Sequence, residues 1–142
     1  MHCMLKINLF DESFRHTFSS SYFSKPTFFE FVRDQYDWDG ITMFTDDWII
    51  KNEVNLVKSK IKIAWLLEPR IIKPYVYNLV DDWQHIYDYI ITHDKEILDK
   101  YPDKSFYCPV GACWIDREDQ NIYIKRKLLS IVVSSKQETL GQ

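Results

Sequence analysis

Two stretches of the chain are apolar at almost every position, unlike the alternating segments around them. Residues 61–67 contain Lys62 as their single polar side chain, and Leu128 to Val133 form a second run of this kind. Runs without alternation are typical of parallel strands that are covered on both faces. We expect both runs to lie in one parallel sheet, and we expect pairing to stop at Pro69, which has no N–H to donate.

Shorter periodic segments predict the other strands. Residues Leu5 to Phe10 alternate between apolar and polar side chains, which indicates a first strand. Apolar runs bounded by turn residues predict further strands at 41–44, 87–92 and 105–110. Residues 11–25 are polar and aromatic, and we expect a long loop there.

Helical spacing appears in three places. Thr27 followed by Glu30 has the form of a capping box and predicts a helix from Phe28 to about Tyr36. Pro74 suits the first turn of a helix that continues past Trp83 with an apolar stripe. A short helix is expected from His93-Asp94 to about Lys100, and residues 48–59 are ambiguous. The alternation of strands and helices predicts an α/β domain with a mainly parallel, Rossmann-like sheet and flanking helices.

Composition narrows the classes of function. The net charge is −3 and no basic block occurs, so electrostatic binding to nucleic acid is not indicated. No segment approaches the roughly 18 apolar residues of a membrane span, and the amino terminus lacks the features of a signal peptide. Three cysteines, an odd number, argue against a disulfide framework and for a reducing, cytoplasmic location.

Glu68 is the strongest candidate for chemistry. It follows the apolar run at 61–67 directly, at the carboxyl end of a strand, where open α/β sheets bind their ligands. Burial at such a position can raise the pKa of a carboxylate, which suits a general base near neutral pH. The structural alternative is that Glu68 only ends the strand or caps the next helix.

Two patterns suggest metal sites but are better explained otherwise. Asp37-Trp38-Asp39 has the D-x-D form that some nucleotide-sugar enzymes use to hold a cation, yet it lies beside a turn glycine in a chain rich in Asp. Cys108 and Cys113, with His93 nearby, have no second pair of ligands, so buried thiols are favoured over zinc. We therefore expect no metal and no cofactor.

Ser134-Ser135-Lys136 follows the second apolar run. Two hydroxyls and a cation after a strand could hold a phosphate group. Residues of these types are also common at strand ends, so the segment by itself is weak evidence.

Three segments together resemble family 10 glycosyltransferases, the α1,3/4-fucosyltransferases and their relatives. Residues 63–69 resemble the strand and Glu-containing loop of that family, and residues 87–94 resemble a later strand that leads to a Pro-x-Gly turn, here Pro109-Val110-Gly111. Residues 130–136 resemble the start of the donor-binding motif. The family's Ser-Asn is Ser134-Ser135 in this chain, and its Glu-Ser-Pro is Glu68-Pro69-Arg70.

The resemblance implies a GT-B type enzyme with two Rossmann-like halves, an acceptor side and a donor side. It implies inverting transfer of a sugar from a nucleotide sugar, typically GDP-fucose, to a glycan hydroxyl. By this resemblance Glu68 is the base, and Ser134, Ser135 and Lys136 bind the donor diphosphate. Trp114 and Tyr75 are candidates for stacking on the acceptor sugar, with core packing as the alternative.

The resemblance also implies a division of the chain. Residues 1–127 are expected to form the acceptor-side domain, and residues 128–142 the start of a donor-binding domain that needs many more residues. Leu128–Val133 would then join the first sheet or leave an apolar edge. The chain alone is expected neither to bind GDP-fucose tightly nor to transfer sugar. The alternative from another class is a non-catalytic α/β module that binds a glycan or a protein.

Overall fold

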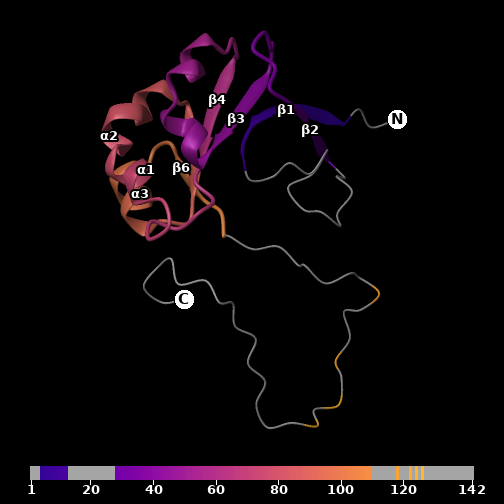
Figure 1. The fold of residues 1–142 in the computed structure, drawn as a ribbon, viewed down its shortest axis with the longest axis vertical. Helices are drawn as coiled ribbons and strands as arrows, with labels where there is room; N and C mark the ends of the chain where they lie inside the picture. The colour runs from indigo at the N-terminus through magenta and orange to yellow at the C-terminus, as the bar shows by residue number, and fades with distance from the viewer. Residues whose placement is uncertain are drawn as a thin grey trace.

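The structure is a computed structural model that describes residues 4–12 and 28–109, together with Glu118, Ile122, Ile124 and Arg126. These residues contain one six-stranded sheet in the order β2-β1-β3-β4-β5-β6 (Figure 1). Every neighbouring pair of strands is parallel, which confirms the predicted Rossmann-like α/β class. The strands are β1 (Leu5–Phe10), β2 (Phe29–Arg33), β3 (Ile41–Thr45), β4 (Ile61–Trp65), β5 (Tyr89–Thr92) and β6 (Ser105–Tyr107).

Short helices connect the strands from β3 onward. They are η1 (Asp46–Ile50), η2 (Asn52–Leu56), α1 (Pro74–Asn78), α2 (Val80–Trp83), η3 (Gln84–Ile86) and α3 (Lys95–Lys100). The chain moves in one direction across the sheet from β3 to β6, so right-handed crossovers place all these connections on the same face. Figure 1 shows α1, α2 and α3 grouped on one side of the sheet.

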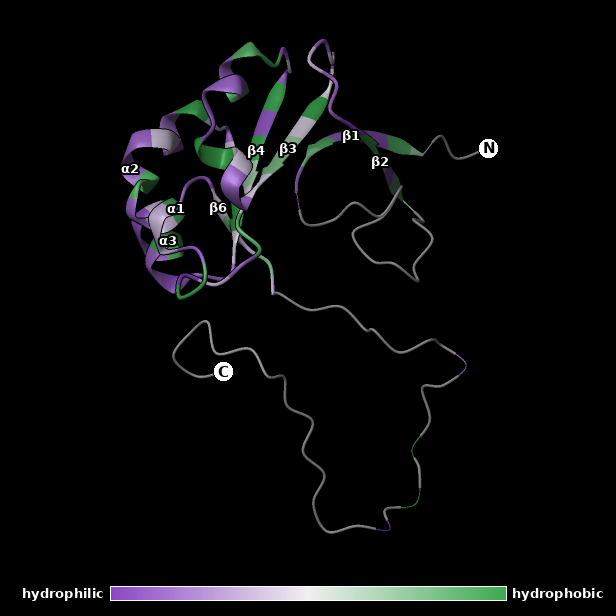
Figure 2. Ribbon diagram, viewed as in Figure 1, coloured by the Kyte–Doolittle hydropathy of each residue, from purple (hydrophilic) through white to green (hydrophobic). Residues whose placement is uncertain are grey.

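The two faces of the sheet carry separate hydrophobic clusters. The helix-covered cluster combines strand residues such as Phe44 and Ile90 with helix residues such as Val76, Trp83 and Ile97. The cluster on the opposite face is built from strand residues, among them Leu9, Phe31 and Met43. In Figure 2 the hydrophobic positions alternate with polar ones along β3 and β4, as expected for strands with two distinct faces.

The predicted helix from Phe28 to Tyr36 is wrong, because this segment contains the edge strand β2. Its residues pair in register with β1, so that Leu5 lies opposite Phe29. Glu30, expected to complete a capping box, instead forms an ion pair with Lys6 across the strands at 3.6 Å. Aromatic and β-branched side chains suit a strand, and pairing with β1 outweighs a local capping signal.

A buried polar network holds the crossover from β2 to β3. This crossover, residues 34–40, passes β1 without a helix, and Asn8 of β1 is completely buried beneath it. The Asn8 amide donates to the Gln35 carbonyl at 2.8 Å and accepts from the Gln35 N–H at 3.1 Å. It also donates to the Thr42 hydroxyl at 3.1 Å, so its hydrogen-bonding groups are paired as burial requires.

The remaining predictions are confirmed in part. The strands predicted at 5–10, 41–44, 61–67, 87–92 and 105–110 all exist, and the last three are shorter than predicted. The helix from Pro74 is divided at Leu79, and the ambiguous residues 48–59 form the two 3-10 helices. Leu128–Val133 and the predicted domain division lie outside the described residues. In the part of the chain described here, the helices are too short to cross a bilayer.

Candidate functional site

The carboxyl ends of β3, β4 and β5 bring several ionisable side chains to one edge of the sheet. Asp46 and Asp47 follow β3, Glu68 follows β4, and His93 and Asp94 follow β5. Because these three strands are parallel neighbours, the residues that follow them meet at one edge. This is the edge at which open α/β sheets bind ligands.

The backbone of Glu68 is fixed on both sides by buried side chains. Its N–H donates to Asp46 Oδ1 at 3.1 Å, and the preceding N–H, of Leu67, donates to the same oxygen at 2.9 Å. Its carbonyl oxygen accepts a hydrogen bond from the Tyr77 hydroxyl at 2.6 Å. Tyr77 is itself almost completely buried in the helix-covered core. The loop after β4 is therefore tied to both β3 and α1.

The Glu68 carboxylate differs from its backbone in having no fixed partner. The side chain is half-buried, and it forms no hydrogen bond or ion pair with another described residue. An ordered backbone with an uncommitted carboxylate is what a functional acid or base requires. The prediction that Glu68 stands at the carboxyl end of a central strand is confirmed, and its catalytic role stays a prediction.

Asp46 is the residue of this site that the sequence reasoning missed. Its exposed fraction is 4%, and its backbone φ is 42°, in the left-handed region. Burial raises the pKa of Asp46, opposed by the hydrogen bonds from Leu67 and Glu68 and reinforced by the negative charges of Glu68 and Asp47. Its second oxygen, Oδ2, is buried and has no hydrogen-bond partner among the described residues. The sequence feature that could have identified Asp46 is its position directly after a buried strand.

Asp47 lies beside Asp46 but in a different environment. Lys73 Nζ lies 2.5 Å from Asp47 Oδ2, and the Tyr75 hydroxyl donates to Oδ1. Burial alone would raise the pKa of Asp47, but these bonds outweigh it and hold the pKa below its ordinary value. The hydrogen bond to Asp47 correspondingly raises the pKa of Lys73.

Tyr75, a predicted acceptor contact, therefore lies at this edge. Its side chain is 44% exposed and is not part of either hydrophobic cluster. The structure thus places it near the site and leaves part of it accessible, and its contact with a sugar stays a prediction.

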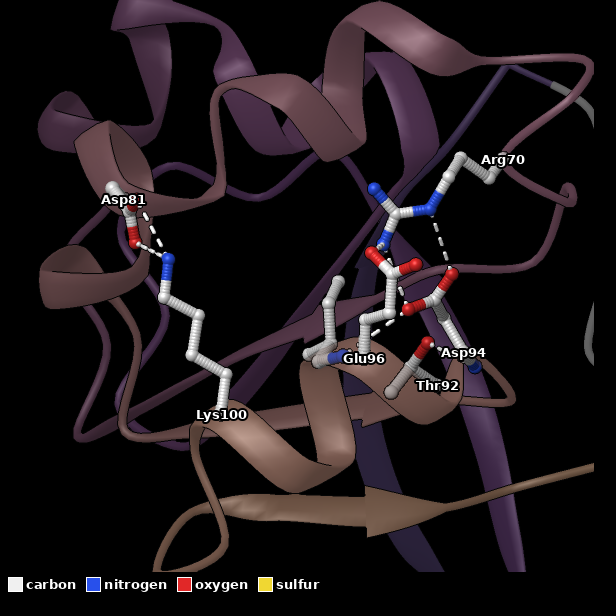
Figure 3. Close-up of polar contacts among 7 residues, drawn as sticks. Arg70, Asp81, Thr92, Asp94, Glu96 and Lys100 are labelled. Atoms are coloured by element: carbon white, nitrogen blue, oxygen red, sulfur yellow. Dashed lines mark hydrogen bonds and ion pairs between the residues drawn. The ribbon is translucent and has the colours of Figure 1, made fainter.

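Arg70 and Asp94 form a two-pronged ion pair that joins the loop after β4 to α3 (Figure 3). Arg70 Nε lies 3.0 Å from Asp94 Oδ2, and its second nitrogen lies 2.8 Å from Oδ1. Glu96 adds a third contact at 3.0 Å, and the guanidinium carbon lies 4.9 Å from the centre of the Tyr77 ring. The hydrogen bonds to Asp94 raise the pKa of Arg70.

These pairings decide which ligands the edge can attract. Lys73 is bound to Asp47, and Arg70 is bound to Asp94 and Glu96. Both side chains are therefore already paired with carboxylates, so neither is a free cation for an anionic ligand.

Among the described residues, the other candidates for metal binding make separate contacts. Asp37 and Asp39 are exposed and pair with Lys58 and Lys60, at 3.7 and 3.1 Å. Cys108 is half-buried after β6, and the buried Nδ1 of His93 has no hydrogen-bond partner among the described residues. Among the described residues, no three His, Cys, Asp or Glu side chains are grouped so that they could hold a metal ion. The remaining candidates, Cys113, Trp114, Ser134, Ser135 and Lys136, lie outside the described residues.

Comparison of the chain with protein-family models, with curated proteins and with solved structures finds no match.

Proposed function

We propose that this chain is the acceptor-side part of an inverting glycosyltransferase of the fucosyltransferase type. In this proposal the edge beside β4 binds a glycan hydroxyl, and Glu68 is the general base. The donor is a nucleotide sugar of the GDP-fucose class, held by residues outside this edge. The Rossmann-like sheet and the resemblance of residues 63–69 to family 10 glycosyltransferases support the assignment.

The reaction requires one proton acceptor at the glycan hydroxyl. The Glu68 carboxylate takes the hydroxyl proton while that oxygen bonds to the anomeric carbon of the donor sugar. The bond from the same carbon to the diphosphate oxygen breaks, and the nucleoside diphosphate leaves with the bonding electron pair. Attack from the face opposite the leaving group inverts the anomeric configuration.

The observation that carries the proposal is the contrast between the backbone and the side chain of Glu68. Its peptide is held by Asp46 and Tyr77, while its carboxylate has no described partner. Had Glu68 been paired to Lys73 or Arg70, a structural role would have been favoured. Those two cations instead bind Asp47 and Asp94, which supports the enzyme over a non-catalytic binding module.

Acceptor binding is the first test. We expect a panel of neutral glycans to include ligands that shift the NMR signals of Leu67, Glu68 and Arg70 in this chain. Glu68→Gln should retain this binding, because it removes a proton acceptor and little contact area. A panel in which no glycan perturbs these signals would overturn the acceptor-side assignment.

Sugar transfer is the second test and separates the enzyme from a binding module. With GDP-fucose added to a system that shows transfer, Glu68→Gln should lower turnover by about 100-fold or more, the range of a general base. Glu53→Gln is the matched control, because Glu53 is an exposed glutamate of η2 outside the site, and it should leave turnover unchanged. Unchanged turnover in Glu68→Gln would exclude the base role.

A further inference from the structure

We propose that Asp46 is the positioning residue of this site, because it clamps the peptide that carries Glu68. The functional part of this inference rests on the proposed role of Glu68, whereas the structural part does not. It assigns two carboxyl groups two different duties, one to order the loop and one to accept a proton.

The first argument is the geometry of the clamp. One oxygen of Asp46 accepts two successive backbone N–H groups, from Leu67 at 2.9 Å and from Glu68 at 3.1 Å. These donors belong to the loop after β4, while Asp46 follows β3, so the contact spans neighbouring strands. Together with the Tyr77 hydroxyl on the Glu68 carbonyl, it leaves the Glu68 peptide little freedom.

The second argument is backbone strain. Asp46 has φ of 42°, a left-handed conformation that costs energy for any residue other than glycine. Aspartate and asparagine tolerate this region better than other residues, and strain of this kind persists only where surrounding contacts impose it. The contacts present here are the two hydrogen bonds to the Glu68 loop, so the strain and the clamp belong together.

The third argument is the absence of a described counter-charge. Asp46 is 4% exposed, and its Oδ2 has no hydrogen-bond partner among the described residues. Glu68 and Asp47, which act on it electrostatically, are both negative. Lys73 and Arg70 are bound to other carboxylates. A buried carboxyl group next to two like charges is costly, so the two N–H donors from the Glu68 loop are the described groups that stabilise it.

The consequence is a site in which Asp46 orders the loop and the Glu68 carboxylate has no described partner. The hydrogen bonds from Leu67 and Glu68 need an acceptor oxygen at position 46, which an amide side chain also supplies. Asp46→Asn conserves that oxygen, the size and the tolerance of left-handed backbone, and it should reproduce the native state. Asp46→Ala removes the clamp.

The experiment measures amide hydrogen exchange at Leu67 and Glu68 in the full chain. Asp46→Asn should retain slow exchange at both amides. Asp46→Ala should exchange these amides about tenfold faster, the factor expected for one lost hydrogen bond.

Two results would overturn the inference. They are fast exchange at both amides in Asp46→Asn and native exchange rates in Asp46→Ala. If Asp46→Ala does not fold, the Asp46→Asn measurement still decides. These readouts do not depend on sugar transfer. If the chain shows no transfer, the proposed function is wrong, while this test of Asp46 still applies.

Where transfer is measured, the positioning role has its own signature. Asp46→Asn keeps the acceptor oxygen and should keep turnover, while Asp46→Ala should lower kcat by about 100-fold with KM little changed, as expected for a misplaced base. Native turnover in Asp46→Ala would exclude the positioning role of Asp46, and Glu68 could still be the base.

Discussion

At the scale of single residues, this edge of the sheet places two neighbouring aspartates in different electrostatic environments. Asp46 and Asp47 are adjacent, yet burial among negative charges raises the pKa of the first, and bonds from Lys73 and Tyr75 outweigh burial and lower the pKa of the second. Environments that shift the pKa values of neighbouring titratable groups in opposite directions are a common feature of sites that use acids and bases. The opposite pKa shifts of Asp46 and Asp47 can be detected through the pH dependence of stability.

The two aspartates should therefore affect stability with opposite signs. A raised native pKa means that folding takes up a proton above pH 3.8, so Asp46 destabilises the fold progressively as the pH rises beyond that value. Asp46→Asn should be more stable than the native chain at pH 7, and the difference should vanish below pH 3.8. Urea unfolding at several pH values measures it.

Asp47→Asn is the matched control. The native pKa of Asp47 is lowered, so its carboxylate contributes stability that is present above pH 3.8 and is lost as the pH falls through the native pKa. The variant should lose about 1 kcal/mol or less at pH 7, the range for a partly exposed ion pair. Equal effects of the two substitutions would contradict the assigned environments.

At the scale of elements, Asp94 links three parts of the fold. Its Oδ1 accepts the N–H of Ile97 at 3.1 Å and so caps α3, and its backbone N–H donates to the hydroxyl of Thr92, the last residue of β5. The same carboxylate binds Arg70 from the loop after β4. Figure 3 shows these contacts together, apart from the exposed Asp81–Lys100 pair at the other end of α3.

Two substitutions separate the cap from the ion pair. Asp94→Asn retains a capping side chain and loses only the charge, so it should cost about 1 kcal/mol or less. Asp94→Ala loses both contacts and should cost about 1 kcal/mol more, the usual contribution of a cap. Thermal unfolding at neutral pH compares them, and equal losses would show that the side chain of Asp94 contributes no cap.

At the scale of the whole molecule, the described helices cover one face of the sheet. That face holds the larger cluster, with residues from five helices packed on β1, β3, β4 and β5. On the opposite face Tyr89 and Phe106 contact each other with ring centres 5.7 Å apart and remain partly exposed. Stability is therefore expected to depend mainly on the helix-covered face.

Two phenylalanines on the sheet provide a direct comparison. Phe44 on β3 is completely buried in the helix-covered cluster, and Phe44→Ala should cost about 3–5 kcal/mol through lost burial and a residual cavity. Phe106 on β6 is 55% exposed, and Phe106→Ala should cost well under half as much. Denaturant unfolding of both variants gives the two values, and similar losses would show that both faces are equally covered.

Much of the fold could be predicted from local patterns. The apolar run at 61–67 followed by Pro69 identified β4 and placed Glu68 after its end, because such runs are typical of parallel strands and proline cannot continue a ladder. The expected cover on both faces is not found, since the described helices lie on one face and β4 is mostly half-buried. The helix from Pro74 and the helix opened by Asp94 could be predicted for the same kind of reason. Their signals are contained within a few neighbouring residues, so no distant partner was needed to recognise them.

What only the tertiary structure decided are the contacts between residues far apart in the sequence. The strand β2 was mistaken for a helix, because its conformation depends on pairing with β1 and not on the capping signal it carries. Asp46 could not be linked to Glu68, since that contact exists only after β3 and β4 pair. Likewise, the sequence contains the charges of Arg70, Lys73, Asp47 and Asp94, but folding alone selects their partners and leaves Glu68 without one among the described residues. Local sequence sets conformation through short-range sterics and periodicity, whereas the protonation and partners of a site depend on distances that only the packed sheet fixes.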